Sequence, residues 1–138
     1  MGIRAEEGGP QMFLNAPRKI CMVFETIYLM REAVKRANQN KVYIPIESLR
    51  GAVKALLEED AVAIYPTNAA NLDEDLREMQ RLSLLTIKGD VVVIYREDFL
   101  RATRFVEKQE ELLKDDRYAS AILEKLKQRA RQIQLLQD

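Results

Sequence analysis

The chain of 138 residues contains no histidine and only one cysteine, Cys21. Histidine is the commonest general base near neutral pH and the commonest zinc ligand. The sequence therefore lacks the residue that general-base catalysis and zinc binding most often use. A single cysteine allows neither an intramolecular disulfide nor a cysteine-cluster metal site. No glycine-rich phosphate loop occurs, and the adjacent Asp115 and Asp116 would point in different directions on a helix. We therefore expect no enzymatic activity, no metal site and no cofactor.

Long apolar runs are also missing. No stretch approaches the roughly 18 consecutive apolar residues that a membrane-spanning helix needs. The first 15 residues include Glu6 and Glu7 and lack the apolar region of a signal peptide. The sequence therefore predicts a cytoplasmic protein with no membrane partner.

An excess of charge of one sign is absent as well. The chain has 22 basic and 22 acidic residues, so it lacks the overall positive charge of many nucleic-acid-binding proteins. The charges are nevertheless segregated. Residues 16–56 carry eight basic and three acidic residues, a net charge of +5, and residues 117–131 carry five basic and one acidic residue, a net charge of +4.

Apolar periodicity divides the first half of the chain into elements. Residues 1–15 are glycine-rich and aperiodic, and we expect a flexible tail there. Apolar residues recur at helical spacing from residue 17 to residue 37 and again from residue 47 to residue 60. The β-branched segment 41–46 between them predicts a short strand, and Pro45 favours an edge position for it.

A third helix and a hairpin follow. Asn71 is a suitable N-cap for a helix whose apolar residues are Leu72, Leu76, Met79 and Leu82. If residues 89–90 form a two-residue type II′ turn, the strand pairs are 88 with 91, 87 with 92, 86 with 93, 85 with 94 and 84 with 95. One face of this hairpin is then wholly apolar and should pack on a helical core, with the other face towards solvent. That apolar face consists of Leu85, Ile87, Val92 and Ile94.

The C-terminal part is helical in pattern. A fourth helix is expected from Glu97 to a break near residues 115–116, and a fifth from Tyr118 to Leu136. The fifth helix carries a nearly heptad seam of apolar residues. Such a helix reaching past a compact domain favours packing against a second copy of the chain, and hence a homodimer. The predicted dimer-interface residues are Ile122, Leu126, Ile133 and Leu136.

The order helix, short strand, helix, helix, hairpin, helix resembles the winged helix-turn-helix superfamily. The phrase LREMQRLSLLTIKGDVVVIY carries most of the resemblance, since it reads as a third helix followed by a wing hairpin, and the resemblance covers residues 16–104. It implies an α+β fold that is mainly helical, with a two-stranded wing, a short edge strand and an appended C-terminal helix. Residues 105–138 would then form a helical extension for dimerisation.

The resemblance also implies where DNA would bind. In this superfamily the third helix commonly enters the major groove and the wing contacts the backbone or the minor groove. Arginine and glutamine can read guanine and adenine edges, and lysine can contact phosphate. The matching positions predict a DNA-binding transcriptional regulator. The implied nucleic-acid-binding residues are Arg50, Lys54, Arg77, Gln80, Arg81 and Lys88.

Acidic residues on the third helix keep a second hypothesis open. Four acids, at positions 73, 74, 75 and 78, would place negative charge near phosphates. A winged helix that serves as a protein assembly module, and binds a basic partner instead of DNA, fits these acids. The cations Arg31, Lys35 and Arg36 of the first helix are likewise open to two interpretations, as a solvated face or as phosphate contacts that share the binding with the second helix.

Overall fold

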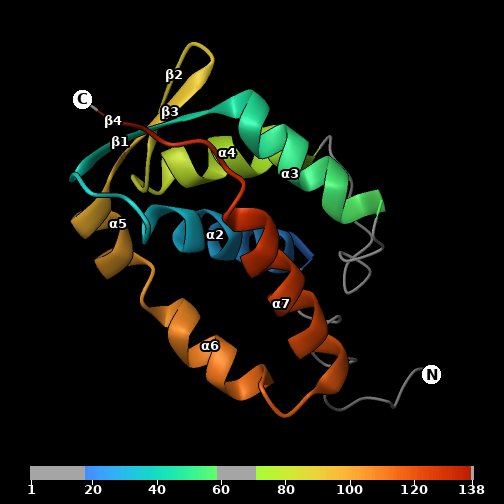
Figure 1. Cartoon of the computed structure of the whole chain (residues 1–138). Helices are drawn as coiled ribbons and strands as arrows, with labels where there is room; N and C mark the ends of the chain where they lie inside the picture. Colours follow the sequence, from blue (N-terminus) through green and yellow to red (C-terminus); the bar gives the residue numbers. More distant parts are fainter. Residues whose placement is uncertain (1–17, 59–70, 138) are drawn as a thin grey trace.

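The computed structural model describes residues 18–58 and 71–137, which fold as an α+β protein (Figure 1). Its helices are α2 (Arg18–Val34), α3 (Ile46–Glu58), α4 (Asn71–Arg81), α5 (Arg96–Ala102), α6 (Phe105–Leu113) and α7 (Arg117–Ala130). Its strands are β1 (Lys41–Pro45), β2 (Thr86–Lys88), β3 (Val91–Tyr95) and β4 (Leu136–Gln137). The predicted N-terminal tail lies outside the described residues.

The sheet is antiparallel with strand order β2-β3-β1-β4. The predicted hairpin register is confirmed for the pairs 88 with 91, 87 with 92 and 86 with 93, while the ladder stops at Thr86. Gly89 has φ +62° and Asp90, the second residue of this two-residue turn, has no positive φ, as a type II′ turn requires. Val92 and Ile94 are fully buried, so the predicted apolar face does pack on the helices.

The prediction that β1 is an edge strand was wrong, because β1 lies between β3 and β4. Its proline fits there for a geometric reason. Ile46 donates its backbone N–H to the carbonyl of Asp90, at the β3 side, at 2.8 Å. The backbone polar groups of successive strand residues point to opposite sides, so the backbone nitrogen and carbonyl of Pro45 point away from β3. On that side β4 pairs only with Val42 and Tyr43, and Pro45 therefore removes no ladder hydrogen bond.

The predicted fourth helix is two helices, α5 and α6, joined at residues 103–104. In a continuous helix the carbonyl of Leu100 would accept the N–H of Arg104. Here that carbonyl accepts a hydrogen bond of 2.8 Å from Arg31, and Arg104 N–H turns to Arg101 O at 3.3 Å. A side chain inserted into the helical ladder is a known cause of kinks.

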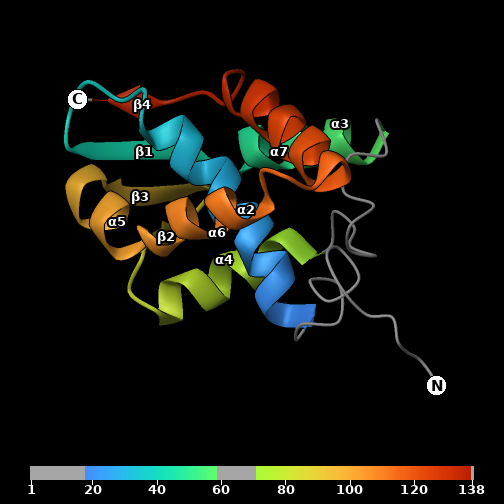
Figure 2. The same cartoon turned by 90° about the horizontal axis from the view of Figure 1, so that it is seen from below.

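The C-terminal helix is not an appendage. In both views α7 lies against the rest of the molecule, and its most extensive contacts are with α2 and α3 (Figures 1 and 2). The apolar seam predicted for a homodimer is instead part of the chain's own core, with Ile122, Leu126 and Ile133 at most 4% exposed. Leu136, at 40% exposed, is the only member of that seam on the surface. Ile122, Leu126 and Ile133 are therefore core residues, and their prediction as dimer-interface residues was wrong, whereas no observation tests Leu136 or dimerisation itself.

Arg36 fastens the end of α7 to α2. Its guanidinium donates to the carbonyl of Ala130, the last residue of α7, at 2.9 Å and to the carbonyl of Ile133, three residues further on, at 2.7 Å. Beyond this clamp, Gln134 N–H donates to Ser48 Oγ at 2.8 Å, and the chain then forms β4. Arg36 thus holds the connection between α7 and the sheet.

We expect Arg36→Ala to lower the free energy of unfolding by about 1–2 kcal/mol, because two hydrogen bonds from a charged but exposed donor are lost. Amide hydrogen exchange of residues 134–137 should accelerate, since β4 is anchored through this clamp. Arg131→Ala, at an exposed arginine beside the same helix end, is the control. Unchanged exchange in β4 after Arg36→Ala would contradict this account.

Candidate nucleic-acid interface

Helix α4 is the element that the resemblance would place in a DNA groove. Its apolar stripe, Leu72, Leu76 and Met79, is buried as predicted. Leu82 lies beyond the helix end and is 53% exposed, so its predicted inward position is wrong. Arg77, Gln80 and Arg81 are exposed. The three buried apolar side chains therefore fix α4 to the core, and the predicted residues lie on its exposed face.

One of the four acids of α4 does not belong to this face. Asp75 is 6% exposed and points at α2, where its Oδ2 accepts a hydrogen bond of 2.6 Å from Thr26 Oγ1. Burial raises its pKa to about 6, against the opposing effect of the Thr26 hydrogen bond. The interpretation of Asp75 as an acid facing phosphates was wrong, because the helix turns it into the α2–α4 contact.

Glu25 of α2 is a second buried acid near this contact. It is 6% exposed, and its Oε2 has no hydrogen-bond partner among the described residues. Burial, and then the charge of Asp75, raise its pKa to about 8. A carboxyl group in such a site is neutral near pH 7, which explains how an acid can occupy the core without an ion pair.

The acids that remain outward are largely paired with the predicted DNA-binding cations. The guanidinium of Arg50 lies 3.4 Å from both carboxylate oxygens of Asp73 and 3.2 Å from Glu47 Oε2. Arg81 forms an ion pair with Glu78. Arg50 therefore joins α3 to the first turn of α4, and two of the six predicted site residues have their charge partly neutralised.

Three predicted cations remain exposed without a hydrogen bond or ion pair to the rest of residues 18–58 and 71–137. They are Lys54 on α3, Arg77 on α4 and Lys88 beside the wing turn. The three lie on separate elements of the fold. These are the side chains in the predicted set whose charge is available to a phosphate.

Gln80 has a different role from the one predicted. Its Oε1 accepts the backbone N–H of Ile87 at 2.6 Å, which fixes the outer edge of β2 against α4. The hydrogen bond satisfies a strand edge that would otherwise be open to pairing. Gln80 therefore sets the position of the wing relative to the helix, a function that only the folded hairpin reveals.

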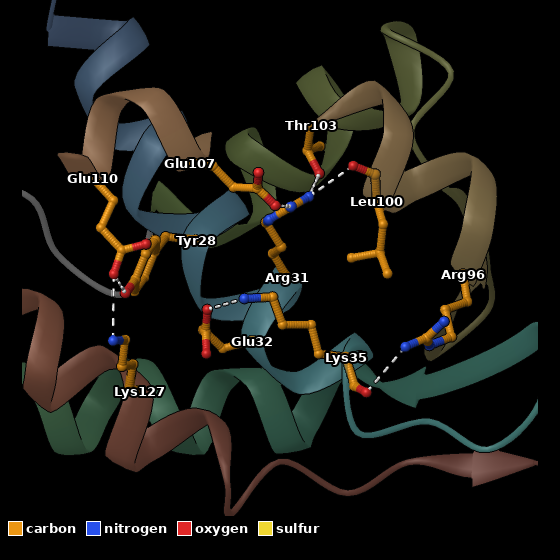
Figure 3. Close-up of polar contacts among 10 residues, drawn as sticks. All are labelled: Tyr28, Arg31, Glu32, Lys35, Arg96, Leu100, Thr103, Glu107, Glu110 and Lys127. Carbon is orange, nitrogen blue, oxygen red and sulfur yellow. Dashed lines mark hydrogen bonds and ion pairs between the residues drawn. The ribbon is translucent and has the colours of Figure 1, made fainter. Parts of the chain in front are cut away.

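Arg31 of α2, and Lys35 and Arg36 just beyond its end, do not form the phosphate-contacting surface that was considered for them. Arg31 is 3% exposed, and Arg36 clamps α7. Lys35 pairs with Glu32 at 2.9 Å (Figure 3). Of these three cations only Arg31 is buried, but each has an acceptor or an ion-pair partner within the described residues, which the sequence could not reveal.

Sequence reasoning also missed a polar network between α2 and the C-terminal helices (Figure 3). Arg31 donates to Leu100 O and Thr103 Oγ1, both at 2.8 Å, and forms an ion pair with Glu107. Alongside it, Glu110 accepts a hydrogen bond of 2.9 Å from Tyr28 Oη and lies 3.3 Å from Lys127 Nζ. No motif marks these residues, because the hydrogen bonds that Arg31 and Tyr28 donate span between 69 and 82 residues of sequence.

Comparisons with protein-family models, with curated proteins and with solved structures give no match. Across the helices of residues 18–58 and 71–137, none is long and apolar enough to cross a membrane. The same residues contain no group of three or more acidic or cysteine side chains placed to hold a metal ion.

Proposed function

We propose that this chain is a winged-helix protein that binds double-stranded DNA as a transcriptional regulator. The fold supports the proposal because β1, which lies between the first two described helices, pairs with the second strand of the hairpin that follows α4. This is the arrangement that joins a wing to a third helix. The observation that carries the proposal is Arg77, exposed on α4 without an ion pair in the described ranges, beside a hairpin that Gln80 holds in place.

Binding would rest on a small number of cations. Lys54, Arg77 and Lys88 are available to phosphates, while Arg50 and Arg81 would have to exchange their acidic partners for phosphate. Such an exchange reduces the net gain, so we expect modest affinity with a shallow salt dependence. The proposal does not include the homodimer predicted through α7, since that seam lies in the core.

We expect Lys54→Ala combined with Arg77→Ala to weaken binding to duplex DNA roughly tenfold at low salt, and to reduce the slope of log affinity against log salt by about 2. Both side chains are exposed, so the fold should persist. The measurement is fluorescence anisotropy with a labelled duplex over a salt series. Lys108→Ala with Arg117→Ala removes the same charge from exposed positions on α6 and α7 and is the matched control.

A winged-helix assembly module is the second candidate. The observation that favours it is the pairing of Arg50 and Arg81 with acids, which leaves exposed Glu74 beside a largely neutral helix face. Such a face suits a basic protein partner better than a phosphate backbone. If both double variants bind duplex DNA equally, or if the native chain does not bind it at low salt, the assembly function is the better account.

A further inference from the structure

Helix α6 carries more apolar surface than the fold covers. Its Val106 and Leu113 are 1% and 8% exposed and belong to the core. Phe105 and Leu112 are 55% and 71% exposed, and they are the two most exposed large apolar side chains in the described part of the chain. The helix lies at the lower edge of the molecule in Figure 1, on the far side from the sheet. It therefore presents two large apolar side chains to solvent.

Phe105 and Leu112 lie on the same face of α6. Residues seven positions apart are separated by two helical turns, so their side chains project from one side of the helix, roughly 10 Å apart along its axis. Between them lie Lys108, which is exposed, and Gln109, which is half-buried. A lysine can hold its ammonium group in water while its methylene stem covers apolar surface. Exposed apolar side chains gathered on one face are typical of an interaction surface.

Arg104 and Glu111 lie along one flank of this face with the same spacing of seven residues. Arg104 immediately precedes α6 and has helical backbone angles, φ −61° and ψ −24°, so it continues the helix geometry. Its side chain is exposed and has no hydrogen bond or ion pair to the rest of residues 18–58 and 71–137. Glu111 forms an ion pair with Lys114, but both side chains are more than half exposed, and such surface pairs contribute little. Both flanking charges are therefore accessible to a partner.

A second copy of α6 complements this face. If two copies pack antiparallel about a two-fold axis near residues 108 and 109, Phe105 of each copy meets Leu112 of the other. A two-fold axis of this kind brings equal flanks together, so Arg104 of each copy meets Glu111 of the other. Parallel packing would instead place Arg104 against Arg104 and Glu111 against Glu111, which is unfavourable. The equal spacing of the apolar pair and the charged pair thus makes the face complementary to itself.

We propose that the chain self-associates through an antiparallel contact of two α6 helices, with Phe105 and Leu112 at its centre and ion pairs between Arg104 and Glu111 at its edge. A uniformly acidic partner would repel Glu111, and a uniformly basic one would repel Arg104. One short helix per copy buries less than the roughly 1,600 Å² of a standard interface. We therefore expect a weak dimer, with a Kd of about 10–100 μM.

Sedimentation equilibrium of the full chain, from about 5 to about 500 μM, measures this association. The mean mass of the native chain should rise with concentration from that of a monomer towards that of a dimer. Leu112→Ser should raise the Kd about tenfold or more, because it removes an apolar side chain from the centre of the contact. Leu82→Ser is the matched control, since Leu82 is also an exposed leucine, 53% exposed at the end of α4, and the Kd should not change.

Exchanging the flanking charges tests the geometry of the contact. Arg104→Glu and Glu111→Arg should each raise the Kd roughly threefold to tenfold, because each places like charges across the two-fold axis. The double variant reverses both charges and restores the opposite pairing, so its Kd should return towards that of the native chain. Rescue of this kind requires that the two positions meet between copies.

Three results would overturn the inference. A native chain that stays monomeric at about 500 μM would leave the α6 face to a different protein. A loss of association in Leu82→Ser as large as that in Leu112→Ser would assign self-association to another surface. Failure of the double charge reversal to restore the Kd would exclude the antiparallel contact. Circular dichroism of each variant checks that the fold is retained, and none of these outcomes depends on DNA binding.

Discussion

Replacing Arg31 by methionine should lower the free energy of unfolding by about 3 kcal/mol. The substitution keeps most of the apolar volume but removes the hydrogen bonds to Leu100 O and Thr103 Oγ1 and the ion pair with Glu107. The arginine side chain is 4% exposed, so water does not replace these bonds at the α5–α6 junction. Glu107 is 59% exposed and regains solvation, which is why the loss should remain well below that of a fully buried ion pair.

Urea unfolding followed by far-ultraviolet circular dichroism measures this effect. Lys35→Met is the matched control, because Lys35 lies one turn along the same helix and has only the surface pair with Glu32; its expected change is below about 0.5 kcal/mol. Arg31→Lys should fall between the two, since an ammonium cannot reach three acceptors on separate residues with fixed geometry. A stability for Arg31→Met that equals that of Lys35→Met would show that the network contributes little.

Glu25→Gln should stabilise the protein at alkaline pH by a few kcal/mol and leave its stability nearly unchanged near pH 5. Burial and the charge of Asp75 raise the pKa of Glu25 from 4.5 to about 8. Below pH 4.5 the carboxyl group is neutral in both the folded and the unfolded chain. Between pH 4.5 and about 8 only the unfolded chain ionises, so the contribution of Glu25 to stability falls as pH rises and is lost above about pH 8.

The amide that this substitution introduces does not titrate, so the variant should lose this part of the pH dependence. Asp75 keeps its own raised pKa of about 6 in both proteins, and comparing native and variant chains at each pH removes its contribution to first order. Glu97→Gln, at an exposed acid of α5 that does not act on Glu25 or Asp75, is the control and should leave the difference flat. A native chain and a Glu25→Gln variant with parallel stability curves from pH 5 to pH 9 would show that Glu25 is ionised in the fold.

Arg31 and Glu25 are both ionisable groups buried in the fold, and the fold accommodates them in opposite ways. A buried arginine cannot become neutral, so Arg31 is accommodated by three acceptors drawn from the α5–α6 junction. A buried carboxylic acid can take up a proton, so Glu25 persists with one oxygen unpartnered within the described residues. Both groups lie on α2, and neither contributes an exposed charge to its surface.

Local sequence determined where most helices lie and the hairpin register, but not the break between α5 and α6 or the strand β4, which was predicted as the end of a helix. Alternation with a period of two, together with glycine at the first turn position, fixes which residues pair, because a shift by one residue would turn the apolar face to solvent. Helical apolar stripes likewise determined that α4 and α7 bury one face. These features depend on residues within a few positions of one another.

Only the tertiary structure decided what each buried face meets. The stripe of Ile122, Leu126 and Ile133 predicts burial equally well within one chain or between two, and the packing of α7 on α2 and α3 decided for one chain. The sequence pattern also does not determine the partners of the charged side chains, since Arg36 donates to carbonyls 94 and 97 residues away. A sequence pattern specifies how polar a position is, whereas its partner depends on contacts between distant segments that form only when the chain folds.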